Sequence, residues 1–171
     1  AFAAGATAVT HLFNAMAPIS AREPGLAGAA LATSGIAIQL IGDGLHVSDE
    51  LLRVAFAAAR GRCSLVTDAV AAAGLPDGAY RLGGVEIELE DGVSRRPDGV
   101  LAGGTSRLAD GLVHLSALGL DAAEAAAAVT ERPGQLLGGG FGRLEPGGPA
   151  DVLVVDEELR VREMLLAGRR L

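Results

Sequence analysis

Polar side chains follow three short apolar runs near the start of the chain, and their types suit metal binding and proton transfer. They are His11 after the run Ala6–Thr10, Asp43 and His46 after Gly35–Ile41, and Asp68 after Cys63–Thr67. Apolar runs of this length are typical of buried strands, and α/β barrels carry their chemistry at the carboxyl ends of such strands. We therefore expect these side chains to gather into one site.

His11 and Asp68 have the clearest chemistry of these side chains. A neutral imidazole can bind a divalent cation, but a lone histidine after a strand is more often structural, because nothing nearby completes a coordination shell. A carboxylate can take a proton from an attacking water and return it to a departing nitrogen. By itself, Asp68 is equally compatible with a helix-capping role.

Phosphate and sugar binding are suggested by three further side chains. Arg22 and His46 could hold a phosphate, because a guanidinium matches phosphate oxygens and an imidazole adds a donor. Taken alone, Arg22 is more typical of a solvated surface. Asn14 is the only asparagine in the chain and lies three positions after His11, so we expect it to make specific hydrogen bonds.

Longer motifs around these residues resemble a known family. They are Thr10–Met16, Arg22–Gly25, Asp43–His46, Val66–Ala69, Leu101–Gly103 and Gly142–Val152. Together they resemble the N-acetylglucosamine-6-phosphate deacetylases, which are metal-dependent enzymes of the amidohydrolase superfamily. The resemblance runs through nearly all 171 residues, but these residues correspond only to the C-terminal half of the sequences in that family. The upstream barrel strands, with a metal-binding glutamate and another metal-binding histidine, have no counterpart, and the Ala-rich start suggests a truncated chain.

The resemblance implies a role for each matched residue. His11 would bind a divalent cation, zinc or iron, and Asp68 would be the catalytic acid and base. Arg22 and His46 would bind the 6-phosphate of a small phosphosugar, and the loop that contains His46 would reach across a homodimer interface. The other residues implied in substrate binding are Asn14, Ala15, Asp43, Gly44, Leu45, Leu101, Ala102 and Gly103.

The implied activity is hydrolysis of N-acetylglucosamine 6-phosphate to glucosamine 6-phosphate and acetate by metal-activated water. Two alternatives stay open. Another amidohydrolase could act on a different acylated amino sugar or on a cyclic amide, and a substrate without phosphate would not need Arg22 and His46. Alternatively, the chain is an inactive fragment, at most a phosphosugar-binding or dimer-forming piece, because His11 is its one convincing metal ligand. As a fragment it should be poorly soluble or oligomeric.

The apolar periodicity predicts the elements that position these residues. The three runs alternate with predicted helices at Leu26–Thr33 and at Leu51–Arg60, for which Ser48 offers an N-cap. This order predicts parallel strands with right-handed crossovers. Further along, the pattern predicts a β-hairpin at Ala79–Glu90, helices at Ser106–Leu118 and Ala122–Val129, and strands at Ala150–Val155 and Arg160–Leu171.

These elements predict an α/β protein in two parts. The family resemblance further implies that residues 1–141 are the C-terminal part of a TIM-like (β/α)₈ barrel, with the hairpin inserted at about 79–98, and that residues 142–171 are strands of a small β-sandwich domain. A complete barrel usually needs about 250 residues. The chain is therefore too short for the whole fold.

Composition excludes some classes of partner. The net charge is −7, there is no lysine and aromatic residues make up 3%, so we expect no nucleic-acid partner. The sequence shows no 18-residue apolar run, leader or lipidation signal, which predicts a cytoplasmic protein without a membrane partner.

Three other features have structural interpretations. Cys63 lies in an apolar run, which predicts a buried, unreactive thiol. His114 lies within a predicted helix, and we expect it to be structural. The glycine clusters Gly103–Gly104 and Gly138–Gly140 lack the spacing of a dinucleotide loop and are expected to be turns or close backbone approaches.

Overall fold

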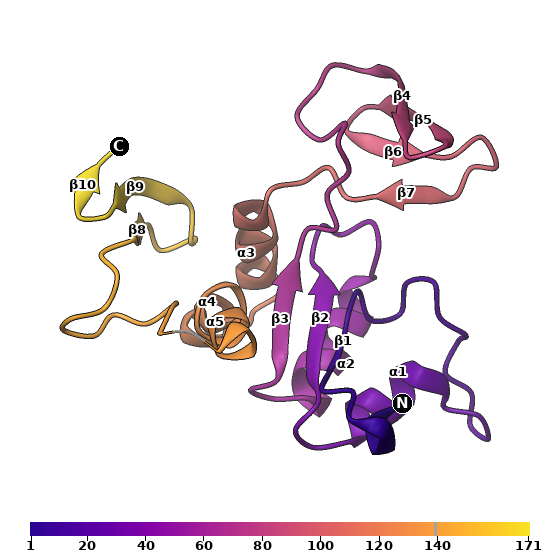
Figure 1. Cartoon of the computed structure of the whole chain (residues 1–171), viewed down its shortest axis with the longest axis horizontal. Coiled ribbons are helices and arrows are strands. Elements are labelled where there is room, and N and C mark those ends of the chain that lie inside the picture. Colours follow the sequence, from indigo (N-terminus) through magenta and orange to yellow (C-terminus); the bar gives the residue numbers. More distant parts are fainter. Residues whose placement is uncertain (139) are drawn as a thin grey trace.

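The computed structural model describes residues 1–138 and 140–171, and a three-stranded parallel sheet lies at its centre (Figure 1). In chain order the strands are β1 (Ala8–Val9), β2 (Ala37–Ile41) and β3 (Cys63–Val66). In the register, Ile38 of β2 pairs with Val9 of β1 and with Cys63 of β3. The predicted parallel order is confirmed, although β1 is shorter than its apolar run.

Helices connect and cover these strands. After a short 3₁₀ helix at Phe2–Ala4, the helices are α1 (Gly25–Ala32), α2 (Asp49–Ala58), α3 (Leu108–Ala117), α4 (Ala122–Val129) and α5 (Glu131–Leu137). The first two form the crossovers between the parallel strands, whereas α3, α4 and α5 all contact β3. Helix α5 was not predicted, because Pro133 and Gly134 are helix-breaking residues. Pro133 is tolerated in the first helical turn, where its missing N–H is not needed.

Helix α2 shows how the local sequence determines an element. The Ser48 hydroxyl accepts a hydrogen bond from the Leu51 amide at 3.4 Å, which confirms the predicted N-cap. Leu52, Ala55 and Phe56 form the buried face of the helix at helical spacing. The helix therefore begins directly after the polar block that follows β2.

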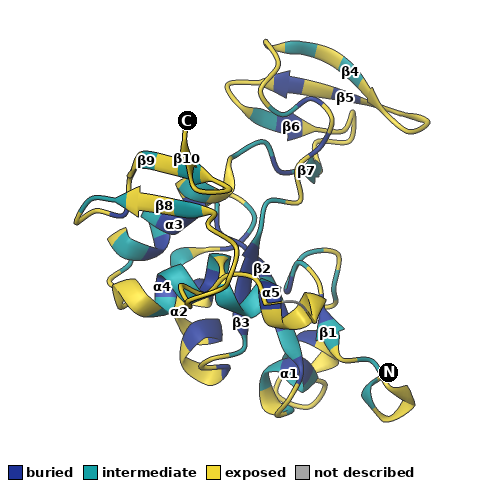
Figure 2. Ribbon diagram, turned by 60° about the vertical axis from the view of Figure 1, so that its left-hand side comes forward, coloured by how far each residue is buried: buried dark blue, intermediate teal, exposed yellow. Residues whose placement is uncertain are grey.

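The main core lies between the parallel sheet and its helices. Five of its leucine and isoleucine side chains are completely buried, namely Leu12, Ile38, Leu40, Leu52 and Leu115. They come from β2, α2, α3 and the segment just after β1, so this core holds in place the elements that carry the polar blocks. Figure 2 shows the corresponding burial along β2 and β3.

The predicted hairpin belongs to a larger antiparallel sheet. It consists, in chain order, of β4 (Gly78–Leu82), β5 (Val85–Glu90), β6 (Val93–Arg95) and β7 (Leu101–Gly103). The turn Gly83–Gly84 between the paired residues Leu82 and Val85 confirms the hairpin. The sequence did not indicate the last two strands, which have only three residues each. In Figure 1 this sheet lies beyond the carboxyl ends of β1–β3.

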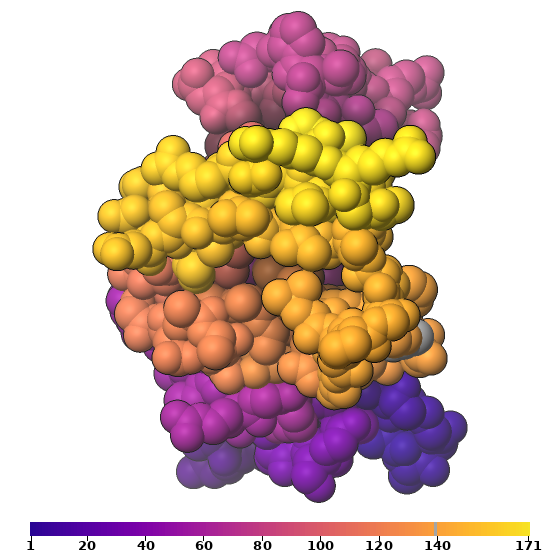
Figure 3. Space-filling model, turned by 90° about the vertical axis from the view of Figure 1, so that its left-hand side faces the viewer, coloured from indigo at the N-terminus to yellow at the C-terminus, as the bar shows by residue number. Residues whose placement is uncertain are grey.

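A second antiparallel sheet contains the C-terminal strands β8 (Val152–Val155), β9 (Val161–Leu166) and β10 (Arg169–Arg170). The last predicted apolar run is thus divided into two strands by the turn at Ala167–Gly168, where both residues have positive φ. A groove of about 750 Å³ separates this sheet from the helices, and Figure 3 shows it as a hollow. Its apolar lining includes Leu112, Val129, Phe141, Leu144 and Leu159.

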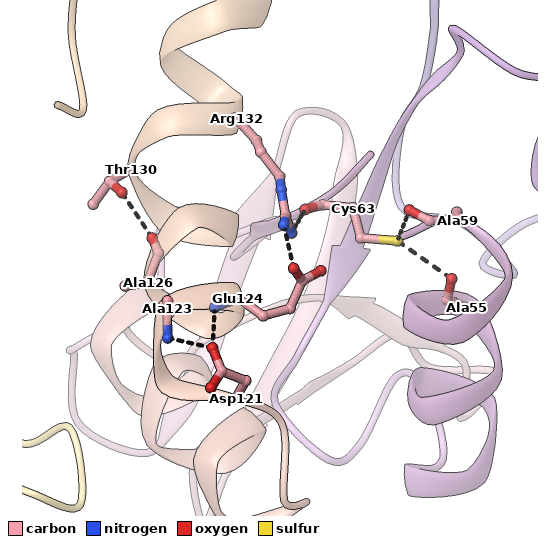
Figure 4. Close-up of polar contacts among 9 residues, drawn as sticks. All are labelled: Ala55, Ala59, Cys63, Asp121, Ala123, Glu124, Ala126, Thr130 and Arg132. Atoms are coloured by element: carbon pink, nitrogen blue, oxygen red, sulfur yellow. Dashed lines mark hydrogen bonds and ion pairs between the residues drawn. The ribbon is translucent and has the colours of Figure 1, made fainter. Parts of the chain in front are cut away.

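Arg132 of α5 binds the side of β3 that has no partner strand (Figure 4). Its guanidinium donates to the Cys63 carbonyl at 2.9 Å and to the Glu124 carboxylate at 2.6 Å. The Cys63 thiol donates to the carbonyls of Ala55 and Ala59. The prediction that Cys63 is buried is confirmed. Burial also raises the pKa of this thiol to about 12, which disfavours the reactive thiolate and supports the prediction that the cysteine is unreactive.

No helix in the described part of the chain is both long and apolar enough to cross a membrane.

Candidate active site

The three polar blocks lie at the carboxyl ends of adjacent parallel strands. His11 follows β1, the loop Asp43–His46 follows β2, and Asp68 follows β3. Because the strands are parallel and adjacent, all three blocks are at one edge of the sheet, as predicted. Figure 1 shows this edge facing the β4–β7 sheet.

Unusual backbone conformations are concentrated in two of these blocks. Seven non-glycine residues among those described have positive φ, and four of them are His11 at 34°, Phe13 at 76°, Ala15 at 53° and Asp68 at 49°. Such conformations are costly for residues with a Cβ and persist where the surrounding structure imposes them, which is common at functional sites. This feature supports a site here independently of residue type.

His11 is held close to the sheet but keeps one ring nitrogen unpartnered. The Leu12 amide donates to the Gln39 carbonyl at 2.7 Å, which attaches the motif to β2. Nδ1 of His11 is buried and has no hydrogen-bond partner among the described residues. An unpartnered buried imidazole nitrogen is suited to binding a cation.

The described residues do not supply the full donor set for a metal. Residues 1–138 and 140–171 contain no group of three or more His, Cys, Asp and Glu side chains that could hold a metal ion. Hydrolytic zinc sites usually have about three protein ligands. His11 fits the role of one ligand, but these residues do not by themselves fit a hydrolytic metal centre.

Asp68 is exposed and lies against the end of β7. The Gly104 amide donates to the Asp68 carbonyl at 2.7 Å. A Cβ on Gly104 would lie 1.9 Å from the Thr67 carbonyl oxygen, and one on Gly103 would lie 2.8 Å from that of Asp68. The prediction of a close backbone approach at Gly103–Gly104 is therefore confirmed, and the contact places the segment Leu101–Gly103 beside Asp68. Gly138 ends α5, whereas Gly139 lies outside the described residues.

The loop after β2 is organised around the Asp43 carboxylate. One oxygen accepts hydrogen bonds from the Leu45 and His46 amides at 2.9 and 3.0 Å, and the other lies 2.7 Å from Nδ1 of His46. Burial of Asp43 acts to raise its pKa, but the hydrogen bonds from the two amides and from the His46 ring outweigh it, so the pKa is lowered. Only Nε2 of His46 is left for a ligand.

The side chains proposed for phosphate and sugar differ in how far the structure constrains them. The side chain of His46 is only 6% exposed, whereas the residue Leu45, at the tip of the same loop, is 55% exposed. Arg22 lies on the exposed segment between β1 and α1, and no hydrogen bond or ion pair joins it to another described residue. The Asn14 amide group donates to the Leu12 carbonyl at 3.3 Å, so part of its hydrogen-bonding capacity is used locally.

His114 contacts the site, although its sequence context indicated only a structural residue. Nε2 of His114 lies 2.9 Å from the Asp49 carboxylate, which is the kind of pairing that a structural histidine makes. Its ring also lies against Gly44, because a Cβ on that glycine would be 2.7 Å from Cε1 of the ring. No feature of the sequence signalled this contact, which depends on how α3 packs against the loop.

The fold and the site together define an α/β protein with a polar site at the carboxyl edge of a parallel sheet. No protein-family model matches the chain. An N-acetylgalactosamine-6-phosphate deacetylase of Escherichia coli O157:H7 is 37% identical over 172 residues, which are 99% of this chain and 46% of that protein. A protein of E. coli K12, provisionally described as the same enzyme, is 36% identical over 93% of this chain and 97% of its own length.

Solved structures of N-acetylglucosamine-6-phosphate deacetylases also match nearly the whole chain. The N-acetylglucosamine-6-phosphate deacetylase of Thermotoga maritima superposes with a TM-score of 0.92 at 32% identity, over 99% of this chain and 47% of that one. A mutant of the Mycobacterium smegmatis enzyme, in complex with N-acetyl-D-glucosamine-6-phosphate, superposes with a TM-score of 0.92 at 36% identity, over 99% of this chain and 46% of that one. The chain belongs to the N-acetylglucosamine-6-phosphate deacetylase family, which here includes relatives named for N-acetylgalactosamine 6-phosphate. It spans about half the length of most of these relatives.

Proposed function

We propose that this chain carries the proton-transfer and phosphosugar-binding part of a metal-dependent deacetylase that acts on N-acetylglucosamine 6-phosphate. The observation that carries the proposal is the position of His11, the Asp43–His46 loop and Asp68 at one edge of a parallel sheet. The family membership agrees with it.

Asp68 is the residue to which we assign proton transfer. Amide hydrolysis needs a base that takes a proton from the attacking water and an acid that gives one to the departing nitrogen, and one carboxylate can do both in turn. The side chain of Asp68 is exposed at the sheet edge, and Gly103 lies so close that its Cβ position would be 3.9 Å from Oδ2. A substrate held along Leu101–Gly103 would therefore lie next to the carboxylate.

The phosphate end of the substrate is assigned to Arg22 and His46, with Asn14 and Ala15 near the sugar. The bond between Nδ1 of His46 and Asp43 leaves Nε2 available, and a guanidinium forms charge-assisted hydrogen bonds to phosphate. We also propose a homodimer in which this loop, with the exposed Leu45 at its tip, contacts the neighbouring subunit.

A second candidate substrate is N-acetylgalactosamine 6-phosphate, because two relatives that match nearly the whole chain are named for it. The acetamide and the phosphate are common to both sugars, so the roles of Asp68 and His46 would be the same. The two candidates differ in the hydroxyl contacts of the sugar ring.

We assign His11 as one ligand of a divalent cation, zinc or iron. Because the described residues contain no group of three possible ligands, the ligand set would have to be completed from outside them. The chain alone should therefore release no acetate. We also propose that β1–β3 are part of a (β/α)₈ barrel spanning 1–141, and that β8–β10 within 142–171 belong to a small β-sandwich.

The test is a chimera in which the N-terminal half of the T. maritima relative precedes this chain. We expect acetate release from N-acetylglucosamine 6-phosphate or its galactosamine counterpart, and far less from the unphosphorylated sugars. Controls are the T. maritima enzyme and the chain alone. A folded chimera with bound metal that releases no acetate from either phosphosugar would contradict the proposal.

A further inference from the structure

The side chain of His114, on helix α3, contacts both the loop after β2 and the first residue of the next helix, α2. Its Nε2 donates to the carboxylate of Asp49, the first residue of α2, at 2.9 Å. Its ring lies over Gly44, where a Cβ would meet Cε1 at 2.7 Å and Nδ1 at 3.2 Å. Gly44 has a φ of +74°, which favours glycine. His114 thus contacts both the loop and the start of the helix that follows it.

Helix α3 can approach this closely because it carries a glycine one turn earlier. A Cβ on Gly111 would lie 3.0 Å from Cδ1 of Leu65 and 3.4 Å from the Gly42 carbonyl oxygen. Residues three apart lie on the same face of a helix, so Gly111 and His114 face the sheet together. Helix α3 therefore packs against Gly42, which lies between the end of β2 and the first residue of the loop, Asp43.

The loop has a second set of constraints from within. Asp43 binds the His46 amide and Nδ1 of the His46 ring, which determines which ring nitrogen is left for a ligand. These bonds orient His46 relative to Asp43, but they do not attach the loop to the rest of the protein. The ring of His114 provides that attachment on the side of α3.

We propose that His114 is a positioning residue that holds the Asp43–His46 loop so that Nε2 of His46 is directed at the phosphate of the substrate. The inference rests on the proposed function, in which His46 binds phosphate. His114 itself touches no substrate, and its effect passes through Gly44 and the loop.

The chain offers a direct readout, because it contains only three histidines. A long-range ¹H–¹⁵N spectrum of the 171-residue chain should show three imidazoles, assigned by single substitutions. We expect His114→Gln to shift or broaden the His46 signals and to leave those of His11 in place. The matched control is Ala117→Gln at an exposed position of the same helix, which should move neither.

Ligand affinity gives the second readout, with glucosamine 6-phosphate and glucosamine as probes. His114→Gln should weaken binding of the phosphosugar about three- to tenfold, the range expected for a lost net hydrogen bond or its equivalent, without changing binding of glucosamine. A purely structural role would lower the melting temperature and leave the ratio of the two affinities unchanged. That result would overturn the proposal.

Asp49→Ala covers the case in which His114→Gln does not fold. Asp49 is about half exposed, and its loss removes the hydrogen bond to His114 from the other side. A smaller shift of the His46 signals in the same direction is expected, and unchanged signals in a folded variant would overturn the proposal. If the wild-type chain binds no glucosamine 6-phosphate, the proposed function fails, whereas the His46 signals still decide whether His114 holds the loop.

Discussion

The sheets β1–β3 and β8–β10 have three strands each but differ sharply in burial. In the parallel sheet, Ile38, Leu40 and Cys63 are completely buried. In the C-terminal sheet no strand residue is buried, as the teal and yellow ribbon of β8–β10 in Figure 2 shows. Leu153 and Met164 are 49% and 42% exposed. Two crossover helices and α3–α5 cover the first sheet, whereas the groove separates the second from its neighbours.

This difference indicates a division of roles. A catalytic group must be held in a defined geometry, and close packing of strands and helices provides the necessary rigidity. The polar blocks are on the packed sheet, and the strained residues His11 and Asp68 follow its strands directly. The C-terminal sheet, in contrast, leaves apolar side chains exposed, and such a surface is typical of a sheet that packs against another part of a protein.

The largest expected effect is on catalysis, and it should be confined to the parallel sheet. In the active chimera, Asp68→Asn should lower turnover by about 10² to 10⁴ because the group that moves the proton is lost, with the metal content unchanged. The matched control in the C-terminal region is Asp151→Asn, which should keep full activity. Acetate release and metal analysis measure both. More than a tenth of the activity in Asp68→Asn would exclude it as the proton shuttle, whereas His11→Ala should lose metal together with activity.

The next effect concerns stability and tests the difference in burial itself. Leu40→Ala in β2 should lower the free energy of unfolding by about 2–5 kcal/mol, because it leaves a cavity in a close-packed core. Leu153→Ala in β8 should cost less than about 1 kcal/mol, because the side chain is already half exposed. Chemical denaturation of both variants measures the contrast. Equal losses would mean that the C-terminal sheet is as tightly packed as the parallel one.

Phosphate binding should depend on the sheet edge and not on the many arginines elsewhere. Arg22→Ala and His46→Ala should each weaken phosphosugar binding by about 1.5–3 kcal/mol, because each removes a charge-assisted hydrogen bond. Arg160→Ala between β8 and β9 is the control, since its side chain is similarly exposed but remote from the edge. Titration with glucosamine 6-phosphate and glucosamine separates the cases. A similar loss for both sugars in Arg22→Ala would exclude it as a phosphate ligand.

The smallest effect is the contribution of Asp43 to stability at low pH. Its pKa is lowered below the usual 3.8, so the ionised form stabilises the folded state above that value, and the contribution is lost as the pH falls below it. Between about pH 5 and about pH 3, the wild type should therefore lose more stability than Asp43→Asn. Asp98→Asn, at an exposed ion pair with Arg96, is the control and should follow the wild type. Unfolding curves at the two pH values decide between these outcomes.

Much of the fold could be predicted because its signals are local. Apolar runs and capping residues within about ten positions determined the parallel strands, helix α2 with its Ser48 cap and the hairpin at Gly83–Gly84. The short strands β6 and β7 escaped this reasoning because three residues are too few to show a period of two. Helix α5 was not predicted because Pro133 is normally a sign that a helix ends, although in the first turn of a helix, where it lies here, proline is tolerated.

The sequence by itself identified the candidate site residues and predicted that parallel strands bring His11, Asp43 and Asp68 to one edge of the sheet, which the structure confirms. Only the tertiary structure decided the strained backbone at His11 and Asp68 and the contact of His114 with the loop at Gly44. His114 and its partner Asp49 are 65 positions apart. Their approach depends on how α3 packs on the sheet through Gly111, and no periodicity along the chain encodes a distance between surfaces that meet only after folding.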